Sequence, residues 1–137
     1  MRLPRAGLVI LALVQVQIGL WALLAPQSFY DDFPGGGRMW VSPLGPFDEH
    51  ALRDVGSLSL ALVALLAYAA WTLEDRIVRL AGVAWLLWAL PHLAYHLTAD
   101  GALSRGDRIA SEGGQAVTIA IALYLLLHRR RTPEVPK

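Results

Sequence analysis

Two histidines, His92 and His96, stand four residues apart near the end of a long apolar segment. Residues at this spacing lie on one face of an α-helix. Two imidazoles on one face can hold a single metal ion, and either can ligate a haem iron. Ionisable side chains are costly at membrane depth and usually face the interior of a helix bundle. This pair is therefore the first candidate for a functional site.

A second polar pair, His50 and Asp54, has the same spacing, and Glu112 lies on a later apolar segment. A zinc peptidase would need a glutamate directly after the first histidine of its motif, and Leu93 follows His92, which excludes that class. Three histidines with one or two carboxylates suit iron, zinc, manganese or copper, and a haem would use one or two of the histidines. The candidate metal ligands are His50, Asp54, His92, His96 and Glu112.

The segments that carry these residues are typical of membrane-spanning helices. The chain of 137 residues is 55% hydrophobic and 17% charged, below the roughly 25% charged residues of soluble domains. Its apolar segments, residues 6–25, 48–71, 77–98 and 108–128, are long enough to cross a bilayer core of about 30 Å. The connection between the second and third is short, which favours antiparallel neighbours. We expect an all-α, antiparallel, up-and-down four-helix membrane bundle over residues 1–131, followed by a disordered tail over residues 132–137.

Residues 26–47 form the one long connection, and their prolines and glycines exclude a long helix or strand. Large apolar side chains are interleaved with these residues, which a flexible linker would not carry. They are Phe29, Tyr30, Phe33, Met39, Trp40 and Phe47. We therefore expect an ordered loop, which either anchors the protein at the membrane surface or forms a lid over a bound ligand.

The distribution of basic residues predicts the orientation in the membrane. The two chain ends and the connection near residue 75 hold Arg2, Arg5, Arg76, Arg79, Arg129, Arg130, Arg131 and Lys137. The opposite side holds Arg38, Arg53, Arg105 and Arg108. The positive-inside rule then predicts a multi-pass plasma-membrane protein with both termini in the cytoplasm. A cleaved signal peptide over residues 6–25 is the alternative, but this apolar run is longer than a typical signal-peptide core.

With this orientation, the candidate ligands lie at similar depths in the outer third of the bundle. The alternative to a metal site is a network of side chains that satisfy one another, such as His92 with Asp54 and Gln115. Arg53 or Arg108 would then form ion pairs with Asp54 or Glu112 that join two helices. The Gly113-Gly114 pair is expected to be a site of close helix packing.

Composition excludes several function classes. The absence of cysteine excludes disulfides, thiolate metal sites, iron–sulfur clusters and thiol redox chemistry. The net charge of +1, with arginines at segment ends, does not favour nucleic-acid binding.

Three segments, residues 40–50, 53–56 and 91–96, resemble segments of small four-helix DoxX-like membrane proteins of actinobacteria. The resemblance implies the four-helix fold and its topology, and it transfers no catalytic residue.

Three functions remain open. The first is a metal- or haem-binding membrane protein, acting as an oxidoreductase or as a hydrolase that uses metal-activated water. The second is a non-enzymatic subunit of a larger membrane complex or homo-oligomer. The third is a small transporter or ligand-binding bundle in the lipid bilayer.

Overall fold

The computed structural model describes residues 2–99 and 103–128. In chain order the elements are α1 (Arg2–Leu24), α2 (Pro26–Asp32), β1 (Pro34–Gly35), β2 (Arg38–Met39), the 3-10 helix η1 (Ser42–Leu44), α3 (Glu49–Thr72), α4 (Asp75–Thr98) and α5 (Arg105–Leu127). The predicted all-α class is confirmed. The predicted tail over residues 132–137 and the basic residues 129–131 lie outside the described residues.

The four long helices lie close to the predicted segments, and the largest difference is at the start of α1. This helix begins at Arg2, although the prediction placed its start at residue 6. The prediction followed the apolar run alone. A helix can also include a proline in its first turn, because the N–H that proline lacks would have no hydrogen-bond partner there. Pro4 lies in the first turn of α1.

Helices α1, α3, α4 and α5 are long and apolar enough to cross a membrane. Several of their leucines point away from the protein, including Leu13, Leu58 and Leu87, which are 64%, 70% and 72% exposed. A soluble protein rarely exposes so much contiguous apolar surface. These helices suggest a membrane protein whose outer faces contact lipid.

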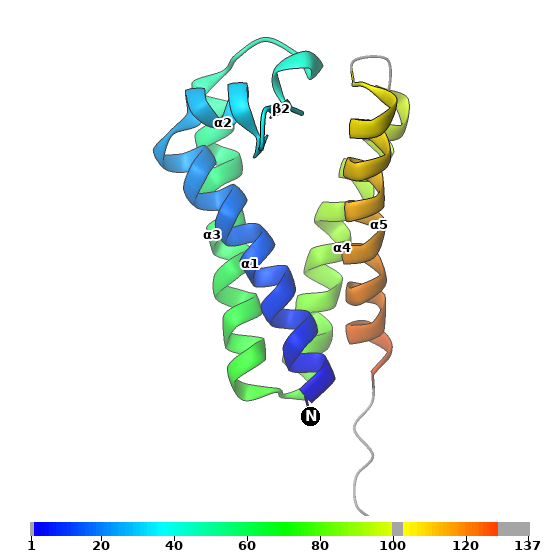
Figure 1. The fold of residues 1–137 in the computed structure, drawn as a ribbon. Helices are drawn as coiled ribbons and strands as arrows, with labels where there is room; N and C mark the ends of the chain where they lie inside the picture. The colour runs from blue at the N-terminus through cyan, green and yellow to red at the C-terminus, as the bar shows by residue number, and fades with distance from the viewer. Residues whose placement is uncertain (1, 100–102, 129–137) are drawn as a thin grey trace, which may run out of the picture.

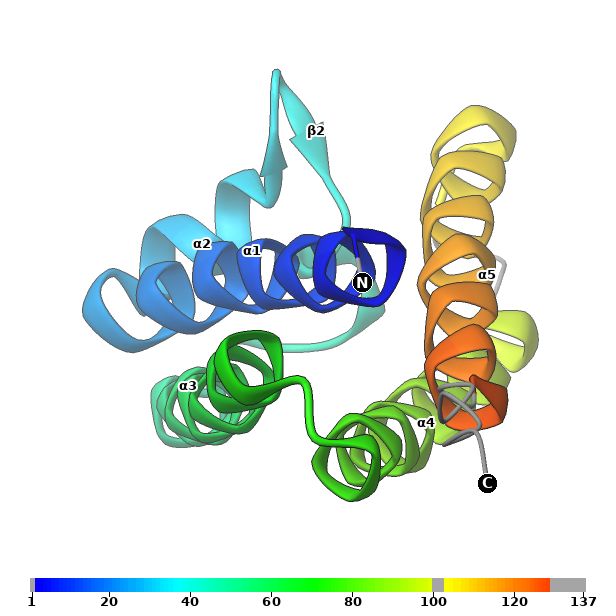
Figure 2. The same cartoon turned by 90° about the horizontal axis from the view of Figure 1, so that it is seen from below.

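The long helices associate as two pairs, α1 with α3 and α4 with α5 (Figures 1 and 2). Along the chain in Figure 1, α1 rises from the N-terminus, α3 returns, α4 rises and α5 returns. We call the end with Arg2, the α3–α4 connection and Leu127 the N-terminal end, and the opposite end the capped end. The two pairs lie close together at the N-terminal end and farther apart towards the capped end (Figure 1).

Glycines allow the backbones of neighbouring helices to touch. A Cβ atom added at Gly56 would lie 2.6 Å from the Leu23 backbone nitrogen, so α1 and α3 are in direct backbone contact there. A Cβ atom at Gly82 would lie 3.0 Å from the Ala122 carbonyl oxygen, which brings α4 and α5 together. The close-packing expectation for Gly113 and Gly114 is wrong, because no heavy atom lies within 4 Å of a Cβ atom added at either position.

The apolar core lies in the half of the bundle towards the N-terminal end, where all four long helices meet. Trp85 is fully buried there with leucines from α1, α3 and α5. The buried core consists of Leu8, Leu11, Leu66, Ala69, Leu73, Val78, Ala81, Trp85, Ala89, Ala122 and Leu125. This core holds the two helix pairs together, because the hydrophobic effect and close packing act mainly there.

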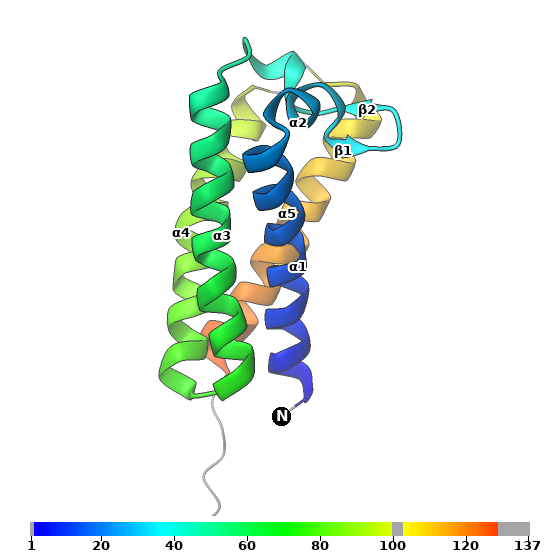
Figure 3. The ribbon, with the colours of Figure 1, turned by 90° about the vertical axis from the view of Figure 1, so that its left-hand side faces the viewer.

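Residues 26–48 cover the capped end and form what we call the capping segment (Figure 3). Within it, α2 is followed by a hairpin in which Pro34 pairs with Met39 and Gly35 with Arg38. The hairpin turns at Gly36 and Gly37, with φ values of 69° and 76°. Glycine adopts this left-handed backbone without strain because it has no Cβ atom, so the two glycines favour a reversal of the chain here.

Candidate functional site

Four aromatic side chains form a continuous row along α4. The rings of Trp85 and Trp88 have centroids 5.4 Å apart, Trp88 stacks on His92 at 5.1 Å, and His92 meets His96 edge to face at 4.7 Å. Their spacing of three or four residues places them on one side of the helix. The row leads from the apolar core towards the capped end, and the two histidines stand at its outer part.

His92 and His96 have different surroundings. His96 is buried, with 8% exposure, and the charge of Glu112 on α5 acts on it. His92 is exposed, although it lies one turn beyond the fully buried Ala89. The covering of this face of α4 therefore changes from turn to turn, since Ala89 and His96 are buried and His92 between them is exposed. The histidine pair lies beyond the apolar core, towards the capped end.

The predicted pair on α3 also forms, but its side chains face away from the protein. His50 Nε2 lies 3.1 Å from an Asp54 carboxylate oxygen, and the side chains are 88% and 63% exposed. The buried face of α3 includes Gly56 and Ser59. Because a helix turns about 100° per residue, Asp54 lies about 200° around the axis from Gly56. The spacing predicted correctly that the two residues share a face, and packing decided which face it is.

The structure does not bring the five predicted ligands into one site. Within residues 2–99 and 103–128, no group of three or more histidine, aspartate or glutamate side chains could hold a metal ion. His50 and Asp54 form one exposed pair, whereas His92 and His96 lie on α4 near Glu112 of α5. Of the two arginines expected to form ion pairs between helices, Arg108 lies 3.6 Å from Glu112 on its own helix, and Arg53 pairs with Glu49 on its own helix.

Three helices carry buried polar atoms that have no hydrogen-bond partner. Among the described residues they are both side-chain amide atoms of Gln15 on α1, the indole nitrogen of Trp85 and Nε of Arg79 on α4, and Oε1 of Glu112 and of Gln115 on α5. Gln15 and Trp85 are completely buried. A buried polar group without a partner typically costs about 1–3 kcal/mol, so five such residues in one small bundle require an explanation.

Three of these residues, Gln15, Trp85 and Gln115, lie at similar depth and on faces directed to the interior. Measured from the N-terminal end at 1.5 Å per residue, they lie about 20 Å, about 15 Å and about 18 Å along their helices. Gln15 is one turn beyond the core residue Leu11, and Gln115 is two turns from the core residue Ala122. Both therefore continue the stripes that form the apolar core. Gln15 and Gln115 thus lie at the edge of the core towards the capped end, whereas Trp85 is itself a core residue.

The sequence places the two glutamines of α1 on different faces of the helix but does not show which of them is buried. Gln15 and Gln17 are two residues apart, a spacing that places them on different sides of a helix. Gln15 is fully buried, and Gln17 is exposed. This outcome confirms that at most one of the two faces a given neighbour, and it identifies that residue as Gln15.

The capping segment is joined to α5 through Asp107, which the sequence reasoning did not single out. The Trp40 indole donates a hydrogen bond of 2.9 Å to this carboxylate, and Arg38 Nη1 lies 3.2 Å from the same oxygen. The Ser104 hydroxyl donates to the other oxygen at 2.6 Å. Ser104 and Asp107 form a Ser-x-x-Asp pattern at the helix start, and this capping signal could have identified Asp107.

Aromatic packing holds the capping segment together. Phe33 has ring centroids 4.7 Å from Phe29, 6.1 Å from Trp21 and 6.1 Å from Trp40. The Tyr30 hydroxyl donates to the carbonyl of Gly45 at 2.7 Å. These contacts extend from α1 to the hairpin, which in turn reaches Asp107. The segment thus links the α1–α3 pair to α5 at the capped end.

Comparison of the chain with protein-family models, with curated proteins and with solved structures finds no match. The resemblance to DoxX-like proteins stays a prediction.

Proposed function

We propose that this chain is a multi-pass plasma-membrane protein that binds a neutral lipophilic small molecule inside the bundle. The proposal rests on one observation, the buried and unpartnered polar atoms that three helices contribute at similar depth. The helix count and apolar outer faces support insertion in a bilayer. The excess of arginines at the N-terminal end favours a cytoplasmic location for both termini and an external location for the capping segment.

The unpartnered atoms define the chemistry of the molecule. Gln15 Nε2 and Trp85 Nε1 are donors, whereas Gln15 Oε1 and Gln115 Oε1 are acceptors. A molecule that satisfies all four needs both carbonyl or ether oxygens and hydroxyl or amine groups. These four atoms belong to uncharged side chains, which favours a neutral molecule, whereas the other two unpartnered atoms belong to the charged Arg79 and Glu112. An apolar body would suit the surrounding core residues.

The histidine pair and the capping segment complete the proposed site on its outer side. The exposed His92 and the buried His96 lie beyond the unpartnered glutamine atoms, towards the capped end. In this proposal a ligand enters between the helix pairs at the capped end, and the capping segment acts as the lid. The alternative role for this segment, anchoring at the membrane surface, uses the same aromatic side chains.

Organic extraction of the purified, untagged protein followed by mass spectrometry tests the proposal. We expect one lipophilic molecule at near one per chain, and we expect Gln15→Leu to reduce its amount at least about tenfold, the equivalent of about 1.4 kcal/mol. Gln17→Leu is the matched control, because it makes the same change on the exposed face of α1. Retention of the molecule in Gln15→Leu, or wild-type protein that yields only bulk lipid, contradicts the proposal.

Metal binding at His92 and His96 is the second candidate. It is favoured by the 4.7 Å separation of the two rings and by the nearby charge of Glu112. Two imidazoles and a carboxylate are a donor set used by non-haem iron and zinc, and manganese, copper and a haem iron are the alternatives. Within residues 2–99 and 103–128, no three potential ligand side chains lie close enough together to hold a metal ion, so the side chains would have to move to bind it.

Elemental analysis of the untagged protein separates this candidate from the first. Metal binding predicts near-stoichiometric iron, zinc, copper or manganese that is lost in the His92→Ala/His96→Ala double variant. The His50→Ala variant is the control and should keep its metal, because His50 is 88% exposed on the outer face of α3. Metal-free protein that stays folded and monodisperse contradicts the metal site and leaves small-molecule binding as the function to test.

A further inference from the structure

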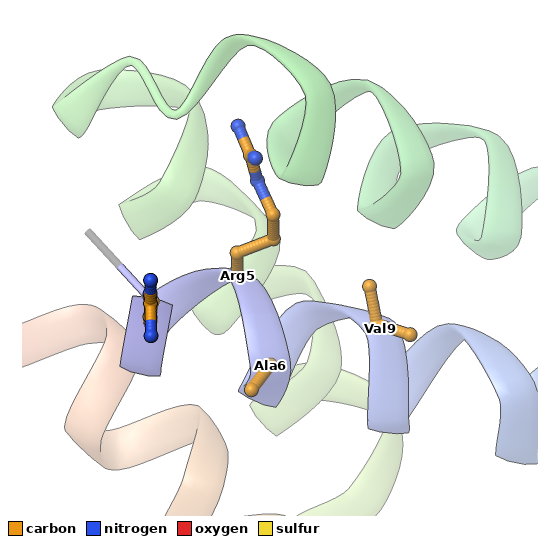
Figure 4. Close-up of a pocket in the computed structure, with 4 residues that line it drawn as sticks. Arg5, Ala6 and Val9 are labelled. Carbon is orange, nitrogen blue, oxygen red and sulfur yellow. The ribbon is translucent and has the colours of Figure 1, made fainter.

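The surface of α1 has a hollow at the N-terminal end of the bundle, opposite the proposed ligand site. Arg2, Arg5, Ala6 and Val9 line it, and its volume is about 340 Å³ (Figure 4). The surface of the hollow is almost entirely apolar, and the two arginines border it. We propose that this hollow holds an anionic phospholipid, with its phosphate at the two arginines and an acyl chain along the wall. The proposal does not depend on the ligand site.

The arginines are available to bind an anion. The Arg5 side chain extends from α1 towards α3, where its Nε donates to the Ala70 carbonyl at 3.0 Å (Figure 4). This bond orients the guanidinium group and uses one of its five N–H donors. Within the described part of the chain, no carboxylate forms an ion pair with Arg2 or Arg5. Both side chains are exposed, so their positive charges face the surroundings.

The apolar wall favours a lipid over a free anion. Val9 is 42% exposed, and Leu13, one turn further along the same stripe, is 64% exposed. The stripe thus runs from two arginines at the helix start into the apolar span of α1. A phospholipid has the same order of groups along the membrane normal, a charged phosphate followed by acyl chains. Clustered basic residues at a membrane interface attract anionic headgroups, and arginine can bind phosphate bidentately.

The test is a titration of the delipidated, full-length protein in detergent, followed by native mass spectrometry. The probe is palmitoyl-oleoyl phosphatidylglycerol, with the zwitterionic phosphatidylcholine of the same chains for comparison. We expect phosphatidylglycerol to bind more tightly, and Arg2→Gln/Arg5→Gln to weaken it at least about tenfold, because each basic residue near a membrane surface contributes roughly fivefold. The control Arg76→Gln/Arg105→Gln removes the same net charge elsewhere and should change binding less than about twofold.

A second variant keeps the test decisive if the double arginine variant fails to fold. Val9→Trp retains both charges and fills the hollow, and we expect it to weaken phosphatidylglycerol binding severalfold. Equal binding of the two lipids overturns the proposal. An equal loss of phosphatidylglycerol binding in the two double arginine variants also overturns it. Unchanged phosphatidylglycerol binding in Val9→Trp overturns it as well. Displacement of the lipid by inorganic phosphate at millimolar concentration also overturns it, because the site would then be a simple anion site.

Discussion

Single residues decide how the capping segment is attached. Asp107 accepts hydrogen bonds from Trp40 and Ser104 and pairs with Arg38. Its backbone N–H is in turn bonded to the Ser104 hydroxyl at 3.2 Å, so this carboxylate is held at the start of α5. The hydrogen bond from Trp40 contributes more to the attachment than the ion pair with Arg38, because exposed ion pairs contribute little.

Replacement of Asp107 should release the hairpin. In Asp107→Ala, Trp40 and Arg38 lose their common partner, so trypsin should cleave after Arg38 severalfold faster than in the wild type. Asp31→Asn is the control, because Asp31 bonds only to Gln27 on the same helix. Cleavage after Arg38 at the wild-type rate in Asp107→Ala would show that aromatic packing alone holds the hairpin.

At the scale of elements, the α1–α3 contact is the closest one. Gly19 faces α3 in the same way as Gly56 faces α1, since a Cβ atom at Gly19 would lie 2.9 Å from Leu60 Cδ2. Close backbone approach at small residues is the usual way in which helices associate in a membrane, where lipid tails are as apolar as leucine. Close packing of the two backbones, as well as burial of apolar side chains, therefore stabilises the α1–α3 pair.

Two glycine-to-alanine changes should have opposite effects on stability. Gly56→Ala would place a methyl group 2.6 Å from a backbone nitrogen and should destabilise the protein by about 1–3 kcal/mol. Gly113→Ala adds a methyl group where no atom lies within 4 Å, and it should stabilise α5 by about 0.5–1 kcal/mol. Unfolding by sodium dodecyl sulfate in mixed micelles measures both changes. Equal effects of the two changes would argue against backbone contact at Gly56.

At the scale of the whole molecule, apolar and polar interior surfaces occupy different parts of the bundle. The apolar core, which includes Trp85, fills the half towards the N-terminal end, and the unpartnered atoms of Gln15 and Gln115 and the histidine pair follow towards the capped end. The core and the attachment through Asp107 hold the two helix pairs together at opposite ends. The interior between these two contacts is where the proposed ligand would bind.

The fold could be read from the sequence because helix formation in a membrane is a local property. An apolar segment of about twenty residues must satisfy its own backbone hydrogen bonds in lipid, so it forms a helix wherever it lies in the chain. The prolines and glycines of residues 26–47 were equally informative, because they restrict the backbone of their own segment. For this reason the helix boundaries were predicted to within a few residues.

The candidate site could be predicted only in part. Spacing placed His92 with His96 and His50 with Asp54, and both pairs form. Spacing could not show that the α3 pair faces away from the interior, nor that Gln15 is buried without a partner. These properties depend on the rotation of each helix about its axis, which is decided by long-range contacts such as those at Gly56.

The sequence by itself therefore determined the four membrane-length helices, the connection between the first two, and which side chains share a helix face. Only the tertiary structure decided which of those faces meet, where the interior is apolar, and that Asp107 joins the capping segment to α5. The physical reason is the range of the interactions. Hydrogen bonding and hydropathy act within a segment, whereas packing depends on residues that are far apart in the chain.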